Sequence, residues 1–229
     1  MSTRYALYFA PHDESQLARF GETVLGRTAT QPRQDDVPSP HPDRQRWLEL
    51  TKSPAHYGFH ATLKAPFELA EGYSIEDLRQ QVEEFAKGQA AIPLTGLRPR
   101  RLSDFAALTL DQQPASLSRF AMRVVETFEP FRRALSEADL QRRRQQPLSD
   151  RQLTLLNRFG YPYVDEEFRF HMTLTGGIGE QDQDYLDWLQ DSFRQQVDDT
   201  PLLDQLAIHE QSSRTAPFVS LHSYPLSSS

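Results

Sequence analysis

Two histidines stand in nearly identical four-residue contexts, and their side chains suit proton transfer. The segments are HATL at 60–63 and HMTL at 171–174. Free histidine titrates at about pH 6.5, so a neutral and a protonated imidazole can coexist near neutral pH. The neutral ring can take a proton from a nucleophile, and the charged ring can give one to a leaving oxygen. Cleavage of a phosphodiester needs both roles. The residues alone leave open whether His60 or His171 is the base.

Both histidines are expected on strands that present one polar face to a shared site. Alternate residues of a strand share a face, so His60, Thr62 and Lys64 are predicted to point the same way. The second polar face is predicted to hold Arg169, His171, Thr173 and Thr175. We expect the hydroxyls of Thr62 and Thr173 and the cations of Lys64 and Arg169 to bind phosphate. Threonine is also common in strands for structural reasons, so the prediction of a site depends more on the two histidines than on the threonines.

Hydrophobic periodicity and turn residues predict the elements that carry these faces. Strands are predicted at 5–10, 59–64, 92–102, 105–110, 168–175, 203–210 and 218–224. Helices are predicted at 13–25, from Ser74, at 117–128, 136–144, 149–159 and 182–196. Ser74 with Asp77, Ser136 and Ser149 are expected N-terminal caps. The proline-rich segment 26–45 is expected to be an exposed loop.

The order of these elements indicates an internal duplication. The two histidine segments sit in similar successions of strands and helices, which gives approximate repeats at 4–104 and 105–226. We therefore expect residues 1–229 to form a single bilobal domain with pseudo-twofold symmetry. The predicted class is α+β, with two mainly antiparallel sheets facing a central cleft and helices outside. Such a cleft is a common ligand site.

Composition narrows the possible partners. The chain has 229 residues, no cysteine and a net charge of −7, so disulfides and thiolate chemistry are excluded. The acidic balance argues against long nucleic acid as a partner, and the cluster Arg142, Arg143 and Arg144 is interpreted as a solvated helix face. Residues 1–10 lack the basic start and apolar middle of a signal peptide, so we expect none, and no apolar run is long enough to span a membrane. A cytoplasmic location is the default expectation.

A metal site is not expected. His56 and His60 are four residues apart, a spacing that can ligate a metal on a helix. The segment has no H-E-x-x-H pattern, and Gly58 together with the strand-like character of 59–64 argues against a helix. We predict neither a metal nor another cofactor.

The two motifs resemble those of the two-histidine (2H) phosphoesterase superfamily, whose mark is H-x-[ST]-hydrophobic in each lobe. The longer segments YGFHATLKAPF (57–67) and YPYVDEEFRFHMTLTG (161–176), with RYALYFAP at 4–11, resemble a branch of unknown function associated with phosphonate-utilisation operons. The resemblance implies a LigT-like bilobal fold and metal-independent action on cyclic or linear phosphodiesters. It also suggests a phosphoribosyl-type substrate.

Several residues around the motifs are further candidates for substrate contact. They are Tyr57, Tyr161, Tyr163 and Thr175. Tyr161 and Tyr163 could stack on a sugar or base, and packing in the core is an equally good interpretation. The predicted partner is a small phosphorylated metabolite.

Three functions remain open at this point. The first is a phosphoesterase that uses His60 and His171 as a general acid/base pair on a small phosphorylated sugar or nucleotide. The second is a non-catalytic module that binds a phosphorylated metabolite in the same cleft. The third is an enzyme that processes RNA ends, which would need a wider basic cleft.

Overall fold

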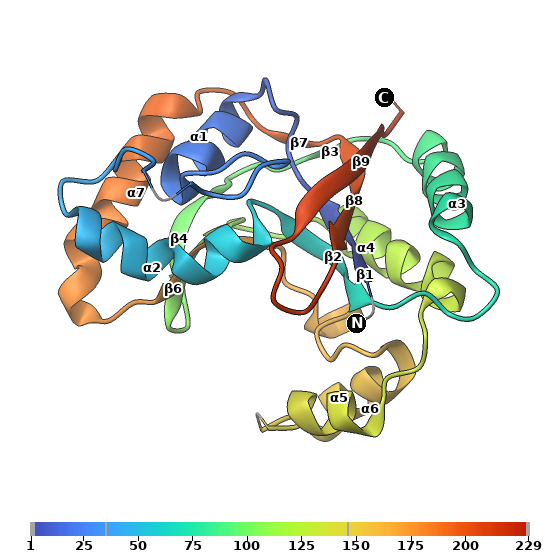
Figure 1. Cartoon of the computed structure of the whole chain (residues 1–229). Helices are drawn as coiled ribbons and strands as arrows, with labels where there is room; N and C mark the ends of the chain where they lie inside the picture. Colours follow the sequence, from blue (N-terminus) through green and yellow to red (C-terminus); the bar gives the residue numbers. More distant parts are fainter. Residues whose placement is uncertain (1–2, 35, 146, 228–229) are drawn as a thin grey trace.

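One antiparallel sheet of seven strands organises the computed structural model, which describes residues 3–34, 36–145 and 147–227 (Figure 1). The strand order is β4-β5-β6-β2-β1-β8-β9. The bounds are β1 Arg4–Phe9, β2 Ala61–Phe67, β4 Arg98–Leu102, β5 Phe105–Thr109, β6 His171–Gly177, β8 Gln205–Gln211 and β9 Val219–Pro225. A second sheet pairs β3 (Ile92–Pro93) with β7 (Leu202–Leu203). The predicted α+β class with antiparallel pairing is confirmed.

The large sheet consists of two halves that meet between β2 and β6. In the described residues these two strands share a single registered pair, Ala61 with Met172. By contrast, β4 and β5 share five pairs. The two sheets expected from the sequence are therefore joined into one at this narrow junction, because the strands diverge on either side of one pair.

The two halves exchange their outer strands, which the linear repeats at 4–104 and 105–226 do not anticipate. In one half, β2 and β1 continue into β8 and β9, which come from the second repeat. In the other half, β6 and β5 continue into β4, which comes from the first repeat. The pseudo-twofold relation thus matches β2 with β6, β1 with β5 and β8 with β4. The boundary between residues 104 and 105 does not separate the two halves of the sheet.

Helices cover the sheet in two groups. The bounds are α1 Gln16–Leu25, α2 Arg44–Tyr57, α3 Ile75–Lys87, α4 Ala115–Thr127, α5 Glu137–Arg143, α6 Asp150–Phe159 and α7 Gln183–Gln196. Helices α2 and α7 contact β6 and β4, and α1 packs on both of these helices. Helices α3 and α4 contact β8, β9 and β2. The pair α5 and α6 lies away from the others at the lower edge of the view (Figure 1). One continuous cluster of buried apolar side chains links both groups to the sheet.

The predicted helix starts are confirmed by the capping geometry. Ser74 accepts a hydrogen bond from the Asp77 N–H while the Asp77 carboxylate accepts one from the Ser74 N–H. Ser136 and Ser149 cap α5 and α6 in the same way through their hydroxyl oxygens. Each cap satisfies an amide that has no partner inside the helix.

Helix α2 is the element that the sequence pattern did not predict. It follows directly on the proline-rich segment, contains Pro54 in its last turn, and ends at Gly58. It is anchored by Trp47, which is fully buried and donates its indole N–H to the Val24 carbonyl at 2.7 Å. Gly58 has a φ of +85°, a backbone conformation that side chains with a Cβ disfavour. This turn connects the end of α2 to the first histidine segment.

In the described residues, no helix combines the length and the apolar character needed to cross a bilayer.

Candidate active site

The junction of β2 and β6 brings both histidine motifs together. Ala61 and Met172 are directly opposite in an antiparallel pair, so His60 stands opposite Thr173, and His171 opposite Thr62. Ala61 and Met172 are buried toward the core, so the four polar side chains lie on the other face. His60 and His171 are therefore diagonal neighbours, which usually lie about 7–8 Å apart, with their Cβ atoms somewhat closer. The junction therefore gathers two imidazoles and two hydroxyls.

A cavity of about 410 Å³ opens over this junction. Its walls include His60, Thr62 and Thr173, together with Tyr8 from β1. His171 is not among the lining residues; it is half-buried at the strand end beside the ring of Phe105, with ring centroids 6.0 Å apart. It is close enough for its charge to lower the pKa of His60. We describe this space as the histidine cavity.

Both imidazoles are held by the same backbone contact. The Nδ1 atom of His60 lies 2.9 Å from the Gly58 carbonyl oxygen, and that of His171 lies 2.8 Å from the Arg169 carbonyl oxygen. A carbonyl oxygen only accepts, so each Nδ1 carries a hydrogen, and Nε2 is the atom that gains or loses a proton. The Nε2 of His60 is 3.3 Å from the hydroxyl of Thr62. This arrangement fixes the tautomer suited to proton transfer at Nε2.

His60 is held in its neutral form by its surroundings. Burial lowers its pKa to about 4, and the charges of His171 and Arg27 lower it further, while the hydrogen bond to Gly58 opposes this shift. The ring stacks on Tyr8, with centroids 3.7 Å apart and planes 19° apart. The ring of Tyr8 also lies 4.9 Å from that of His209, which is buried, and burial holds the pKa of His209 well below the ordinary value. With a pKa of about 4, the ring of His60 is neutral at pH 7.

Two of the three candidate tyrosines line the histidine cavity. Tyr57 and Tyr161 both do so, and burial raises the pKa of Tyr161 to about 12. Tyr57 also stacks on Phe218 with centroids 5.5 Å apart. Tyr163 does not line this cavity and instead packs edge-on against Tyr161 at 5.4 Å. Its place is beside the cavity wall.

Lys64 is not in the histidine cavity, contrary to the prediction from strand alternation. One step along β1, from Leu7 to Tyr8, is matched by two steps along β2, from Lys64 to Thr62. This bulge reverses the alternation, so Lys64 faces the core side together with Leu7. Its ammonium group pairs with Glu129 at 2.9 Å and donates to the Val125 carbonyl at 3.0 Å. Lys64 therefore fastens β2 to the end of α4.

Arg169 and Thr175 also lie elsewhere. Strand β6 begins at His171, so the alternation does not extend back to Arg169, whose exposed side chain donates to the carbonyls of Glu166 and Phe168. It lines a different cavity beside α4. An irregularity in the pairing of β6 with β5 turns Thr175 inward, where its hydroxyl accepts from the Ala106 N–H at 2.8 Å.

Residues outside the motifs complete the walls. Arg4 and Arg143 line the histidine cavity together with Tyr8. Arg143 belongs to the cluster that the sequence suggested was a solvated helix face, and its position on α5 instead brings it over the ring of Tyr161 at 6.0 Å. The run of three arginines in the sequence does not indicate which of them faces the cavity. The alternation of the first strand could have singled out Tyr8.

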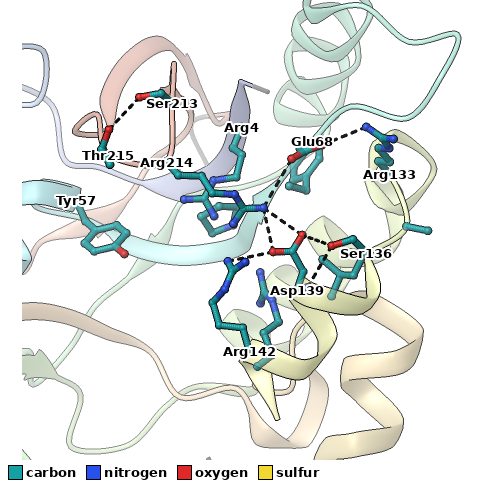
Figure 2. A pocket seen from close by; sticks show the side chains of 15 residues that line it. Arg4, Tyr57, Glu68, Arg133, Ser136, Asp139, Arg142, Ser213, Arg214 and Thr215 are labelled. Atoms are coloured by element: carbon teal, nitrogen blue, oxygen red, sulfur yellow. Dashed lines mark hydrogen bonds and ion pairs between the residues drawn. The ribbon is translucent and has the colours of Figure 1, made fainter. Parts of the chain in front are cut away.

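A larger cavity adjoins the first. Its volume is about 920 Å³, and it shares Arg4, Tyr57, Pro66 and Arg143 with the histidine cavity. Figure 2 shows its side chains converging from α5, β1 and the loop between β8 and β9. We call this space the arginine basin. In the described part of the chain, no three His, Asp or Glu side chains converge in a way that could hold a metal ion.

Comparisons with known proteins give a family and two relatives. The family model described as "Protein of unknown function (DUF1045)" matches residues 62–219. Ribose 1,5-bisphosphate phosphokinase PhnN of Janthinobacterium sp. (strain Marseille) is 41% identical over 231 residues, which cover 98% of this chain and 51% of that protein. The protein of the same name from Laribacter hongkongensis (strain HLHK9) is 36% identical over 185 residues, covering 78% of this chain and 41% of the relative.

The chain thus spans about half the length of these curated relatives or less. Among solved structures, the apo form of E. coli LigT aligns with a TM-score of 0.47 at 12% identity, covering 99% of this chain and 98% of that one.

Proposed function

Because this chain belongs to the DUF1045 family, whose function is unknown, we propose its activity from the geometry of the histidine cavity. The protein is a metal-independent phosphoesterase that hydrolyses a phosphodiester of a small phosphorylated sugar or nucleotide. The observation that carries the proposal is the matched anchoring of two imidazoles, each bonded through Nδ1 to the carbonyl two residues before it. With Nδ1 engaged in both rings, the two Nε2 atoms are available for proton transfer to and from one substrate.

The different surroundings of the two rings support different roles for them in this proposal. His60 is neutral at pH 7 because burial lowers its pKa to about 4, so it takes the proton from an attacking water. The donor role then falls to His171, which gives a proton to the departing oxygen. One P–O bond forms to the water oxygen as the ester P–O bond breaks, and the two rings exchange protonation states. The hydroxyls of Thr62 and Thr173, which line the cavity, donate to the non-bridging oxygens.

The names of the relatives support a sugar phosphate as substrate. Both are called ribose 1,5-bisphosphate phosphokinase, and the matching region accounts for only about half of each or less. A phosphoribosyl compound handled in phosphonate metabolism is therefore the substrate class that we favour. The resemblance of the two histidine motifs to 2H phosphoesterases agrees with this choice.

The kinase activity in that name is not proposed for this chain. A nucleotide-binding loop reads G-x-x-x-x-G-K-[ST] and joins a strand to a helix. The closest segment here is GETVLGRT at 21–28, which has Arg27 in the lysine position and lies largely within α1. Arg27 is buried and donates to the carbonyls of Ala55 and Phe218. It is a structural cation that is not available to a phosphate.

The proposal is tested by hydrolysis of 2′,3′-cyclic AMP in excess EDTA by the wild type, His60→Ala and His171→Ala. Each variant should lose about 10²- to 10⁴-fold in kcat, the usual contribution of a general acid or base. His12→Ala, at an exposed position, is the control and should keep wild-type activity. Full activity in either His60→Ala or His171→Ala would contradict the assigned pair, and loss of wild-type activity on chelation would contradict metal independence.

Two other outcomes would favour the alternatives. Tight binding of phosphorylated ligands with no turnover over a broad panel of diesters would favour a binding module. Turnover confined to RNA ends, with affinity that falls steeply with added salt, would favour RNA processing.

A further inference from the structure

The arginine basin carries more positive charge than its own carboxylates can offset. Five arginines line it, with Glu68 and Asp139 as the acidic side chains among the lining residues. Asp139 is shared between Arg214 at 2.9 Å and Arg142 at 3.0 Å, as Figure 2 shows. Arg133 pairs with Glu68 at 3.3 Å. These two carboxylates are therefore already engaged by three of the five arginines.

The other two arginines, Arg4 and Arg143, are those shared by both cavities. Within the residues that the structure describes, neither forms an ion pair with a carboxylate. Arg4 donates to the side-chain oxygen of Gln211, and Arg143 lies over the ring of Tyr161. These two guanidinium groups thus stand at the passage from the histidine cavity to the basin.

Gathering these cations in a partly desolvated space is unfavourable without an anion. Burial lowers the pKa of Arg4, and the charge of Arg214 lowers it further. Burial likewise lowers the pKa of Arg143; the charge of Asp139 opposes this shift and that of Arg4 adds to it. A bound phosphate would reverse this repulsion, because guanidinium groups form strong, often bidentate hydrogen bonds to phosphate. The hydroxyls of Ser213 and Thr215 line the same space.

We propose that the arginine basin binds a second, terminal phosphate of the substrate while the scissile phosphodiester lies at the histidine pair. This inference rests on the proposed function and narrows its substrate class. The substrate is a small sugar phosphodiester that carries a separate phosphomonoester, with Arg4 and Arg143 placed between its two anionic groups. A nucleoside cyclic phosphate without the second group would fill the histidine cavity alone.

Equilibrium binding measured by calorimetry tests this without any need for turnover. Adenosine 3′,5′-bisphosphate should bind at least about tenfold tighter than adenosine 3′-monophosphate, a gain typical of a charge-assisted contact. Arg143→Gln and Arg214→Gln should each reduce this ratio toward one. Arg119→Gln, which removes the same charge from an exposed position on α4 outside the basin, should leave the ratio unchanged. Equal affinities of the two ligands for the wild type would overturn the proposal.

A third ligand separates a small metabolite from the backbone of RNA. The dinucleotide ApAp keeps the 3′-phosphate of the bisphosphate but has an internucleotide diester in place of its 5′-phosphomonoester. It should bind less tightly than the bisphosphate; an equal or greater gain would overturn the assignment to a phosphomonoester. Since binding is measured, a failed hydrolysis assay with a preserved bisphosphate preference would reject the catalytic proposal and keep the basin. Hydrolysis of the cyclic diester without a preference for the bisphosphate would reject the basin and keep the catalytic proposal.

Discussion

Strands β2 and β6 contain the same motif with the same backbone anchor, yet their histidines lie in different environments. His60 is stacked on Tyr8 and desolvated, so its pKa falls to about 4. His171 lies at the strand end, beside Phe105 and outside the cavity wall. The two histidines thus occupy equivalent positions in the two halves, as expected from a duplication. Their neighbouring side chains nevertheless give the two rings unequal environments. A base and an acid need this inequality, because two identical imidazoles would compete for one proton.

The largest effect on stability is expected at Lys64, whose equivalent in the other half, Thr175, also faces inward but carries no charge. Lys64→Ala should lower the free energy of unfolding by about 3 kcal/mol, because it removes a buried ion pair and leaves a void. Urea unfolding measures this. Lys87→Ala, which breaks an exposed pair with Glu83, should leave it nearly unchanged because water screens such pairs. In the folded Lys64 variant kcat/KM should be retained; a tenfold loss would restore Lys64 as a phosphate ligand.

Lys64 also shows which part of the site could not be predicted from the sequence. Alternation correctly placed His60 and Thr62 on one face, because one registered pair fixes the face of its neighbours. It failed at Lys64 and Thr175, because bulges and irregular pairings depend on the partner strand and leave no local signal. Helices with strong apolar periodicity and serine caps were predicted, whereas α2 depends on contacts such as that of Trp47 with Val24. In the tertiary structure β4 and β8 each pair with strands of the other repeat. The order of elements along the chain does not predict this pairing.

A second effect concerns acid stability, to which the desolvated half should contribute most. The pKa of His60 is about 4 and that of His209 is depressed by burial, while both would titrate at about 6.5 when unfolded. The unfolded chain then binds more protons, so stability should fall as the pH drops from about 6.5 toward 4. His60 should contribute on the order of 1–2 kcal/mol between pH 7 and 5, and His209 should contribute in the same direction.

Urea midpoints measured across this range check the assignment. His209→Leu should make the decline shallower, and His12→Leu, which alters an exposed ring, should not. A decline that is unaffected by the loss of His209 would contradict its neutral state in the folded protein.

The smallest effects are expected at the paired threonines. Thr62→Val and Thr173→Val should each lower kcat/KM about tenfold, because each removes one donor to the phosphate. Thr175→Val is the matched control, since its hydroxyl bonds to the backbone of β5; it should lower stability and preserve kcat/KM. Unequal losses at Thr62 and Thr173 would show which half holds the phosphate more closely. Losses under twofold at both would remove the threonines from the site.

The central claim, a base at His60 and an acid at His171 around one phosphorus, is tested most directly by changing the leaving group. Two diesters that differ only in releasing 4-nitrophenoxide or an alkoxide should be compared in His60→Ala and His171→Ala. The nitrophenoxide departs without a proton, so His171→Ala should recover at least about a hundredfold relative to the alkoxide substrate. His60→Ala should remain equally impaired on both diesters. Recovery in His60→Ala, or equal defects of both variants on both diesters, would contradict the account.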